Sequence, residues 1–255
     1  SMGQNSWKVL WEPLFAGKFN KYAGKIPASW FWARVKKRSP SLGYPDGGFE
    51  SFAQAIVQKT TNLGGQIFYQ TIVEKIEKIN DKFQLSVYDL KAKNKKRKVF
   101  DKVICTLPFP FFLKITSGLS QNYKNRLATL EGLGAVNLVL RLKKQFLLDN
   151  TYWLNINEKK FPFLAIVEHT NFIAKKNYGG EHIVYVGNYL PPKHKYFMLE
   201  DDKLFNIYKP YLEKINSDYN FKQNLVDLKV FKTPFAQPII PLNYSKILPP
   251  LDTPI

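Results

Sequence analysis

Few residues in this sequence are of a type and spacing that could do chemistry unaided. The three histidines, His169, His182 and His194, do not have the mutual spacing of metal ligands. The one cysteine, Cys105, lies in the apolar run 103–105, so neither a disulfide framework nor a cysteine-based metal site is available. The sequence therefore predicts no metal site, and it identifies no catalytic residue.

A dense turn signal at residues 42–49 is more informative, because it contains the adjacent glycines Gly47 and Gly48. Glycine lets the backbone pass close to a cofactor, or to Tyr44, without a clash from a β-carbon. The same pair could equally form only the tight turn into the helix that follows. Both interpretations stay open at the level of sequence.

The elements that must position such residues follow from hydrophobic spacing. Helical spacing predicts a short helix at residues 7–15 that kinks or restarts at Pro13, and further helices at residues 28–35, from about 50 to before 64, within 111–133, and at 201–215. Alternation and apolar runs predict strands at residues 66–70, 72–79, 83–88, 98–100, 102–106, 136–142, 152–156, 163–168, 182–189 and 225–231.

The connections between these elements are also predicted. The basic run 91–98 is expected to form a solvated hairpin loop, and the proline-rich tail 234–254 is expected to have no helix or strand. Together the elements indicate an α+β fold in which helices pack on a mixed, largely antiparallel sheet.

Composition narrows the class of protein. The 255 residues are 45% hydrophobic and 15% aromatic, enough for a substantial core. No apolar run reaches the roughly 18 residues of a membrane-spanning helix, and no secretory signal is evident, so a cytoplasmic protein is expected. The formal charge of +18 favours contact with anions, but no nucleic-acid-binding signature accompanies it. No nucleic-acid partner is expected.

One ordered set of motifs resembles the amine oxidase family of flavoproteins, which includes protoporphyrinogen oxidases and phytoene-desaturase-like enzymes. The set is Tyr44-Pro45-Asp46-Gly47-Gly48-Phe49, a helix, Gly64-Gly65-Gln66-Ile67, Val73-Glu74-Lys75-Ile76, and Asp101-Lys102-Val103-Ile104-Cys105-Thr106-Leu107-Pro108. The resemblance implies an oxidoreductase that carries FAD in its complete form, because a flavin transfers hydride itself and leaves binding and orientation to the protein.

The resemblance also implies cofactor-binding residues. Val73 matches the strand position whose backbone N–H and C=O recognise adenine. Thr106, Leu107 and Pro108 end a strand at the place where nucleotides lie in open α/β folds. Gly47 and Gly48 complete the set. Val73 could also be an ordinary strand residue, and Pro108 could simply stop a strand.

The resemblance divides the chain into segments of a two-domain FAD oxidoreductase. Residues 1–42 and 111–233 are expected in the substrate domain, 43–110 in the FAD-binding domain, and 234–255 in a return segment toward the flavin. The family's G-x-G-x-x-G motif and its closing flavin segment are not present in the sequence. We therefore expect a fragment that is inactive alone.

One departure from the family pattern bears on the substrate. Many amine oxidases have a lysine that holds a water against the flavin, and by local spacing after Gly134 the corresponding residue is Asn137. This disfavours simple amine oxidation and favours an apolar porphyrin-like or isoprenoid substrate, for which many aromatic residues are available. A flavoprotein isomerase resembling UDP-galactopyranose mutase and a non-enzymatic basic module that binds lipid or nucleic acid are the alternatives.

A cluster of aromatic and basic residues also allows peripheral membrane contact. Trp30, Phe31 and Trp32 precede Lys36, Lys37 and Arg38, so rings could lie at the level of lipid headgroups with cations against anionic lipid. The competing interpretation is a buried aromatic helix with a basic end.

Overall fold

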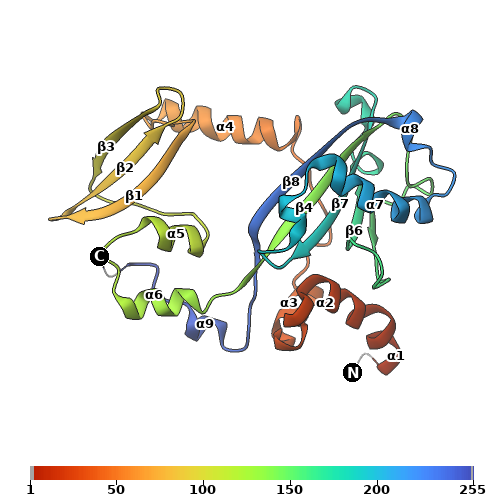
Figure 1. Ribbon diagram of the computed structural model, residues 1–255, viewed down its shortest axis with the longest axis horizontal. Helices are drawn as coiled ribbons and strands as arrows, with labels where there is room; N and C mark the ends of the chain where they lie inside the picture. Colours follow the sequence, from red (N-terminus) through yellow and green to blue (C-terminus); the bar gives the residue numbers. More distant parts are fainter. Residues whose placement is uncertain (1–2, 254) are drawn as a thin grey trace. The chain divides into compact units, whose positions relative to one another are not determined.

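Two groups of strands organise the chain (Figure 1). The computed structural model describes residues 3–253 and 255; Ser1, Met2 and Pro254, the last at the end of the predicted proline-rich tail, lie outside the described residues. The chain divides into a first compact unit of residues 1–30 and 131–242 and a second compact unit of residues 31–130 and 243–255. Each unit is described by itself.

The first unit is built on a five-stranded sheet with the order β5-β6-β7-β4-β8. Its strands are β4 (Gly132–Leu142), β5 (Trp153–Asn155), β6 (Ala165–Glu168), β7 (His182–Leu190) and β8 (Leu225–Pro238). Every neighbouring pair in this sheet is antiparallel. The α+β class with a largely antiparallel sheet is thereby confirmed.

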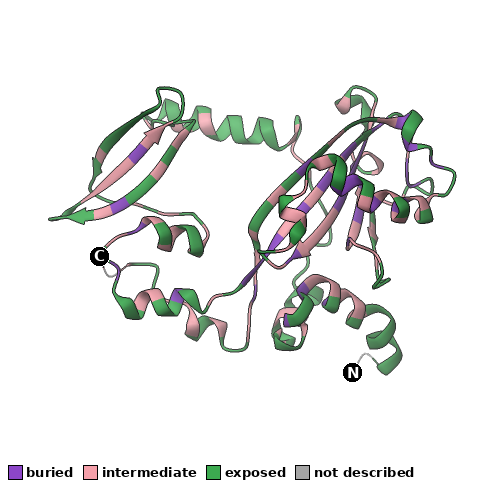
Figure 2. Ribbon diagram, in the orientation of Figure 1, coloured by how far each residue is buried: buried purple, intermediate pink, exposed green. Residues whose placement is uncertain are grey.

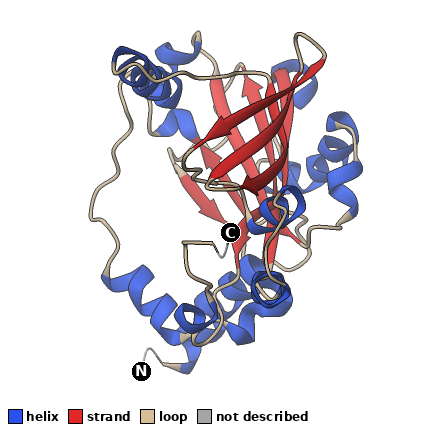
Figure 3. Cartoon of the chain, turned by 90° about the vertical axis from the view of Figure 1, so that its left-hand side faces the viewer, coloured by secondary structure: helices blue, strands red, loops and turns tan. Residues whose placement is uncertain are grey.

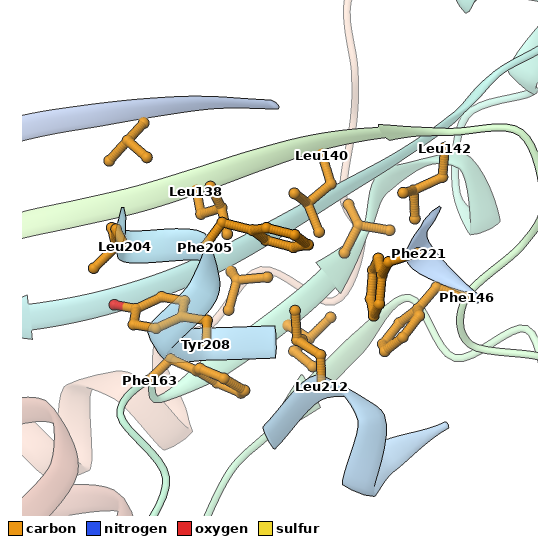
Figure 4. Close-up of a cluster of buried hydrophobic side chains, with 14 of the residues drawn as sticks. Leu138, Leu140, Leu142, Phe146, Phe163, Leu204, Phe205, Tyr208, Leu212 and Phe221 are labelled. Carbon is orange, nitrogen blue, oxygen red and sulfur yellow. The ribbon is translucent and has the colours of Figure 1, made fainter. Parts of the chain in front are cut away.

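Alternation along β4 fixes which face of this sheet is buried. Val136, Leu138, Leu140 and Leu142 are at most 1% exposed, whereas the residues between them are half-buried or exposed. Figure 4 shows these leucines directed toward Leu204, Tyr208 and Leu212 of α7 (Asp201–Ile215), which has the spacing of an amphipathic helix. Each such side chain contributes about 1.5–3 kcal/mol when fully buried.

Helices at the start of the chain belong to the first unit as far as Trp30. They are α1 (Gln4–Ser6), a π-helical turn (Trp7–Trp11), α2 (Glu12–Phe19), a 3-10 turn (Asn20–Lys25) and α3 (Ala28–Lys36). The helix predicted to kink or restart at Pro13 does not restart, because residues 4–19 are helical without a break; the chain changes there only from the π-helical turn to α2, with Pro13 in the first turn of α2. Phe15 and Phe19 are buried beneath the ring of Trp30.

The second unit contains a smaller antiparallel sheet with the order β1-β2-β3, formed by β1 (Thr71–Ile79), β2 (Lys82–Asp89) and β3 (Asn94–Phe100). Its helices are α4 (Gly48–Asn62), α5 (Phe109–Ile115), α6 (Gln121–Ala128) and α9 (Tyr244–Ile247). Figure 3 distinguishes the strands from the helices and loops. The start and end predicted for the helix after the glycine pair agree with α4.

Two predicted strands are wrong. Residues 66–70 and 102–106 belong to no strand. A strand is stabilised by its neighbours, and both segments leave apolar side chains in solvent, with Phe68 53% and Ile104 91% exposed. Both segments have an apolar pattern typical of strands, but no partner strand pairs with either of them among the described residues.

Other boundaries also differ from expectation. Only residues 90–93 form the turn of the basic hairpin, and Lys95 to Lys98 lie in β3, where lysines suit an edge strand. The helix expected within 111–133 is two short helices, α5 and α6, separated at Gly118 with φ 81°. The tail is not free of regular structure, because β8 continues through Pro234 to Pro238 at the edge of its sheet and α9 follows.

Burial differs between the elements (Figure 2). Buried residues line β4, β7 and one side of α7, whereas no residue of α4 is buried. The apolar residues Phe49, Phe52 and Ile56 of α4 are 62%, 54% and 52% exposed. Their spacing of three and four residues places them on one helical face that the described residues leave uncovered.

Candidate functional site

The glycine turn of the second unit enters α4. Gly47 and Gly48 have φ of 75° and 83°, which side chains with a β-carbon rarely adopt. The N–H of Gly48 donates to the C=O of Pro45 (2.9 Å), and the Ser51 hydroxyl donates to the C=O of Gly47 (2.9 Å). A β-carbon on Gly48 would lie at an ordinary 3.7 Å from the Tyr44 hydroxyl. Backbone conformation therefore requires glycine here, and a cofactor contact of this turn stays a prediction.

Val73 lies on β1, an edge strand of the three-stranded sheet. It is half-buried and opposite Val87, and a bulge follows at Glu74. Alternate residues of an edge strand direct their backbone N–H and C=O away from the sheet. Ile76 does so, because its C=O accepts a hydrogen bond from Ser117 N–H (2.9 Å). Residues 116 and 117 therefore already occupy the outer edge of β1 at Ile76, and recognition of adenine at Val73 stays a prediction.

Thr106 and Leu107 are exposed, and Pro108 is the N-cap of α5. The C=O of Pro108 accepts hydrogen bonds from Phe111 N–H (2.9 Å) and Phe112 N–H (3.1 Å). After α5 the chain forms a parallel bridge from Thr116 to Ile76 of β1. The short segment of α5 and Thr116 thus connects residues 106–108 to the strand of Val73. Gly47 and Gly48 instead lie next to residues 44, 45 and 51. All six predicted residues lie in the second unit.

The fit of these residues to FAD is partial. The exposed residues Thr106 and Leu107, at the end of an extended segment, suit a nucleotide, and so does the edge strand β1 outside its bridge at Ile76. The sequence contains no G-x-G-x-x-G turn of the kind that holds a pyrophosphate at a helix N-terminus, and the Gly47-Gly48 pair before α4 does not have that spacing. The second unit therefore fits the nucleoside end of FAD better than its phosphates.

Two titratable residues of the first unit, Glu168 and His182, stabilise the fold around the turn after β4. Glu168 is fully buried and accepts hydrogen bonds from the N–H groups of Phe146 and Leu147, and its Oε1 lies 3.3 Å from Nδ1 of His182. Burial raises the pKa of Glu168, and the bond from Leu147 opposes that rise. Burial, with the nearby Lys175 charge, lowers the pKa of His182. The carboxylate anchors the turn that follows β4.

The other two histidines are also engaged. His169 Nε2 is hydrogen-bonded to the Tyr178 hydroxyl (2.6 Å), and His194 Nδ1 accepts from Tyr196 N–H (3.2 Å). Burial lowers the pKa of both imidazoles. Within residues 3–253 and 255, no three His, Cys, Asp or Glu side chains gather as metal ligands.

Sequence reasoning missed the face of the five-stranded sheet opposite α7. Asn137 lies on it, with Gly187 of β7 on one side and Phe231 of β8 on the other. Tyr185 and Tyr189 flank Gly187 along the same strand. The alternation of each strand was visible in the sequence, but the pairing that brings residues 137, 187 and 231 side by side was not.

Comparison with known proteins agrees with this architecture. The model of the family described as flavin containing amine oxidoreductase matches residues 9–241. A putative protoporphyrinogen oxidase from Exiguobacterium sp. 255-15 shares 12% identity and a TM-score of 0.59, with 76% of this chain and 41% of that chain covered. Among curated proteins, none matches the chain.

Two further solved structures are similar in fold. An oxidoreductase from Methanosarcina mazei has 17% identity and a TM-score of 0.67, covering 89% of this chain and 54% of that one. Reduced UDP-galactopyranose mutase has 14% identity and a TM-score of 0.65, covering 96% and 55%. The chain spans about half the length of the structures it matches. The family's description names a flavin, which agrees with FAD as the expected cofactor. The match across residues 9–241 shows that this chain belongs to the flavin containing amine oxidoreductase family.

Proposed function

We propose that the chain is the substrate-side portion of an FAD-dependent oxidoreductase that oxidises or desaturates an apolar substrate. The family match over residues 9–241 carries the proposal. The flavin, when bound, accepts a hydride from the substrate. The protein's tasks are then to bind, orient and exclude water, which needs no catalytic triad.

Each unit has a part in this proposal. The second unit supplies the edge strand β1 around Val73 and the exposed residues before α5, which suit the nucleoside end of FAD. The first unit supplies the five-stranded sheet, and the substrate would lie against its face opposite α7. The porphyrin-like, isoprenoid and amine classes are the candidates for that substrate, and Asn137 disfavours the amine.

Redox turnover tests the proposal. The full-length protein is purified with FAD, mixed anaerobically with candidate substrates, and followed at the flavin absorbance near 450 nm. We expect bleaching by an apolar substrate and recovery of the absorbance with oxygen. A full-length flavoprotein that no member of the three substrate classes reduces would contradict an oxidase or desaturase function.

A flavoprotein isomerase is the second candidate, favoured by the likeness to UDP-galactopyranose mutase over 96% of this chain. That solved protein is described in its reduced form. For an isomerase, chemically reduced flavin would be needed for turnover of a sugar nucleotide and would remain reduced afterwards. The same anaerobic experiment distinguishes the two functions, because only in an oxidoreductase does the substrate reduce the bound flavin.

Contact with a membrane surface is a further proposal, and it concerns α3. No described helix is long and apolar enough to span a membrane. Trp30 packs on Phe15 and Phe19, so the predicted aromatic patch is divided, but Trp32 and Val35 are each 55% exposed on α3. These two side chains, followed by Lys36, Lys37 and Arg38, could contact an anionic lipid surface.

A further inference from the structure

Glu168 and His182 form a pair at one end of the five-stranded sheet. Glu168 ends β6 in register with Val184 of β7, and His182 begins β7 two residues before Val184. The two side chains are therefore diagonal neighbours on one face of the sheet. Glu168 is fully buried and the His182 side chain is 12% exposed, so water has little access to either group.

Both oxygens of the Glu168 carboxyl group have polar neighbours. Oε2 accepts hydrogen bonds from the N–H groups of Phe146 (3.2 Å) and Leu147, and Oε1 also accepts from Phe146 N–H (3.1 Å). Oε1 lies 3.3 Å from Nδ1 of His182. Nδ1 is buried, and among the described residues no other group satisfies it. The contact between Oε1 and Nδ1 therefore needs a proton, since two buried lone pairs that face each other repel.

Two arrangements supply that proton. In the first, Glu168 is ionised and a neutral His182 donates from Nδ1, which leaves one negative charge in the core. In the second, the pair binds one more proton, and its net charge is zero. Burying a net charge costs more free energy than burying a neutral hydrogen-bonded pair, so burial favours the second arrangement.

The titratable groups around Glu168 do not compensate an ionised carboxyl group. Burial raises the pKa of Glu168, the two backbone hydrogen bonds oppose that rise, and the negative charge of Asp149 adds to it. Tyr219 stays neutral, because burial and the nearby Glu168 raise its pKa. His169, the next residue along the chain, also stays neutral at pH 7, because burial lowers its pKa.

The groups around His182 likewise disfavour a charged pair. Burial, with the positive charge of Lys175, lowers the pKa of His182. Glu181, the preceding residue, is paired with Arg141 at 2.7 Å between Oε2 and Nε. The shifts of Glu168 and His182 therefore both favour the uncharged pair.

We propose that Glu168 and His182 share one proton at neutral pH, and that this neutral pair holds the connection between β4 and β5 (residues 143–152) in place. In the unfolded chain at about pH 7.5 the glutamate is ionised and the histidine is mostly neutral, since their ordinary pKa values are 4.5 and 6.5. The folded pair then binds one more proton than the unfolded pair. Its stabilising effect is present up to about pH 6.5 and is lost between that pH and the pKa of the pair.

Two further hydrogen bonds hold this connection, and neither titrates in that range. Asn216 Nδ2 donates to the C=O of Phe146 (2.8 Å). The Tyr219 hydroxyl donates to the C=O of Lys144 (2.8 Å), and the pKa of Tyr219 is raised. Loss of the proton shared by Glu168 and His182 is therefore the event that weakens the connection as pH rises.

Hydrogen exchange of the full-length protein tests the inference, read by mass spectrometry on peptides that cover residues 143–152. Rates from about pH 6.5 to pH 9 are divided by the intrinsic rate at each pH, which gives the equilibrium constant for local opening. Glu168→Gln is the informative variant, because its amide can accept from Leu147 N–H and donate to His182 without ionising. Glu181→Gln, which removes a carboxyl group next to His182, is the matched control.

We expect the opening constant of wild type and of Glu181→Gln to rise about tenfold across this pH range, because opening releases one proton. That of Glu168→Gln should change less than about twofold. A wild-type profile that is flat, or that rises toward low pH, would show that the folded pair holds no additional proton and would overturn the inference. Parallel profiles of wild type and Glu168→Gln would overturn it too. If Glu168→Gln does not fold, the wild-type profile alone decides.

Discussion

Single residues of this protein are constrained more by conformation than by chemistry, and Gly48 is the clearest case. Its φ of 83° leads directly into α4. We expect Gly48→Ala to destabilise the second unit by about 1–2 kcal/mol, the cost of the left-handed conformation for a residue with a β-carbon. Urea unfolding followed by circular dichroism measures the loss. Gly24→Ala is the control, because Gly24 has no positive φ and a β-carbon added there would meet no atom within 4 Å.

His169 gives a pH-dependent prediction at the same scale. Burial lowers its pKa from the ordinary 6.5, so below about pH 6.5 the unfolded chain binds a proton that the folded chain does not. Stability contributed by the neutral imidazole is present above that pH and is lost as pH falls toward the lowered pKa. We expect wild type to lose more unfolding free energy than His169→Gln between pH 7.5 and 5.5.

The glutamine variant is informative because its amide can keep a hydrogen bond to the Tyr178 hydroxyl. Other groups that titrate in this range, including Glu168 and His182, are common to both proteins and cancel in the difference. Parallel stability profiles of the two proteins would show that His169 does not titrate differently on folding.

At the scale of elements, hydrophobic spacing along the sequence predicted the helices and strands that have one clearly apolar face. The helical spacing of Leu204, Tyr208 and Leu212 gave α7 its boundaries, and the alternation of β4 gave a strand with a buried face. Residues 66–70 and 102–106 have equally apolar patterns but lack strand partners among the described residues, so periodicity alone misassigned them.

The core beneath α7 allows a quantitative test. Leu212 is fully buried within a cluster that includes Phe146 and Phe221. We expect Leu212→Ala to lower the unfolding free energy of the first unit by about 2–5 kcal/mol, because the change removes apolar contacts and leaves a cavity. Lys214→Ala, two residues along the same helix and exposed, should cost under about 1 kcal/mol. Similar losses in both would contradict the packing of α7 on β4.

The basic end of α3 is tested by charge reversal. We expect wild-type protein to float with vesicles containing phosphatidylserine, and a variant with Lys36, Lys37 and Arg38 changed to glutamate to lose most of that binding. The matched control changes Lys93, Lys95 and Lys96 of the basic hairpin to glutamate, with the same change in net charge. If both variants float equally, or both fail equally, α3 has no specific role in membrane contact.

At the scale of the whole molecule, the candidate site was only partly readable from sequence. The turn at Gly47 and Gly48 and the strand of Val73 were predicted where they lie, because glycine pairs and alternation are local signals. The face of the five-stranded sheet opposite α7 was missed, since residues 137, 165, 187 and 231 become neighbours only through the register of four strands. Long-range register depends on the packing of the complete sheet, which no short window of sequence contains.

Exposed apolar surface leads to the last prediction, which concerns FAD. The face of α4 bearing Phe52 and Ile56 and the unpaired segment around Ile104 are uncovered among the described residues, and the chain spans 41–55% of the solved structures it matches. Affinity for FAD depends strongly on a pyrophosphate cradle, which this sequence lacks. We therefore expect the 255-residue chain alone to bind FAD weakly and to purify colourless.

The full-length protein should hold about one flavin per chain, measured by absorbance after heat release. Replacing Phe52 and Ile56 by lysine should then weaken flavin retention in the full-length protein, if the exposed face of α4 packs against its FAD-binding segment. Lys59→Ala, on the same helix, is the control. A 255-residue chain that purifies yellow with stoichiometric flavin would show instead that residues 1–255 bind the whole cofactor, phosphates included.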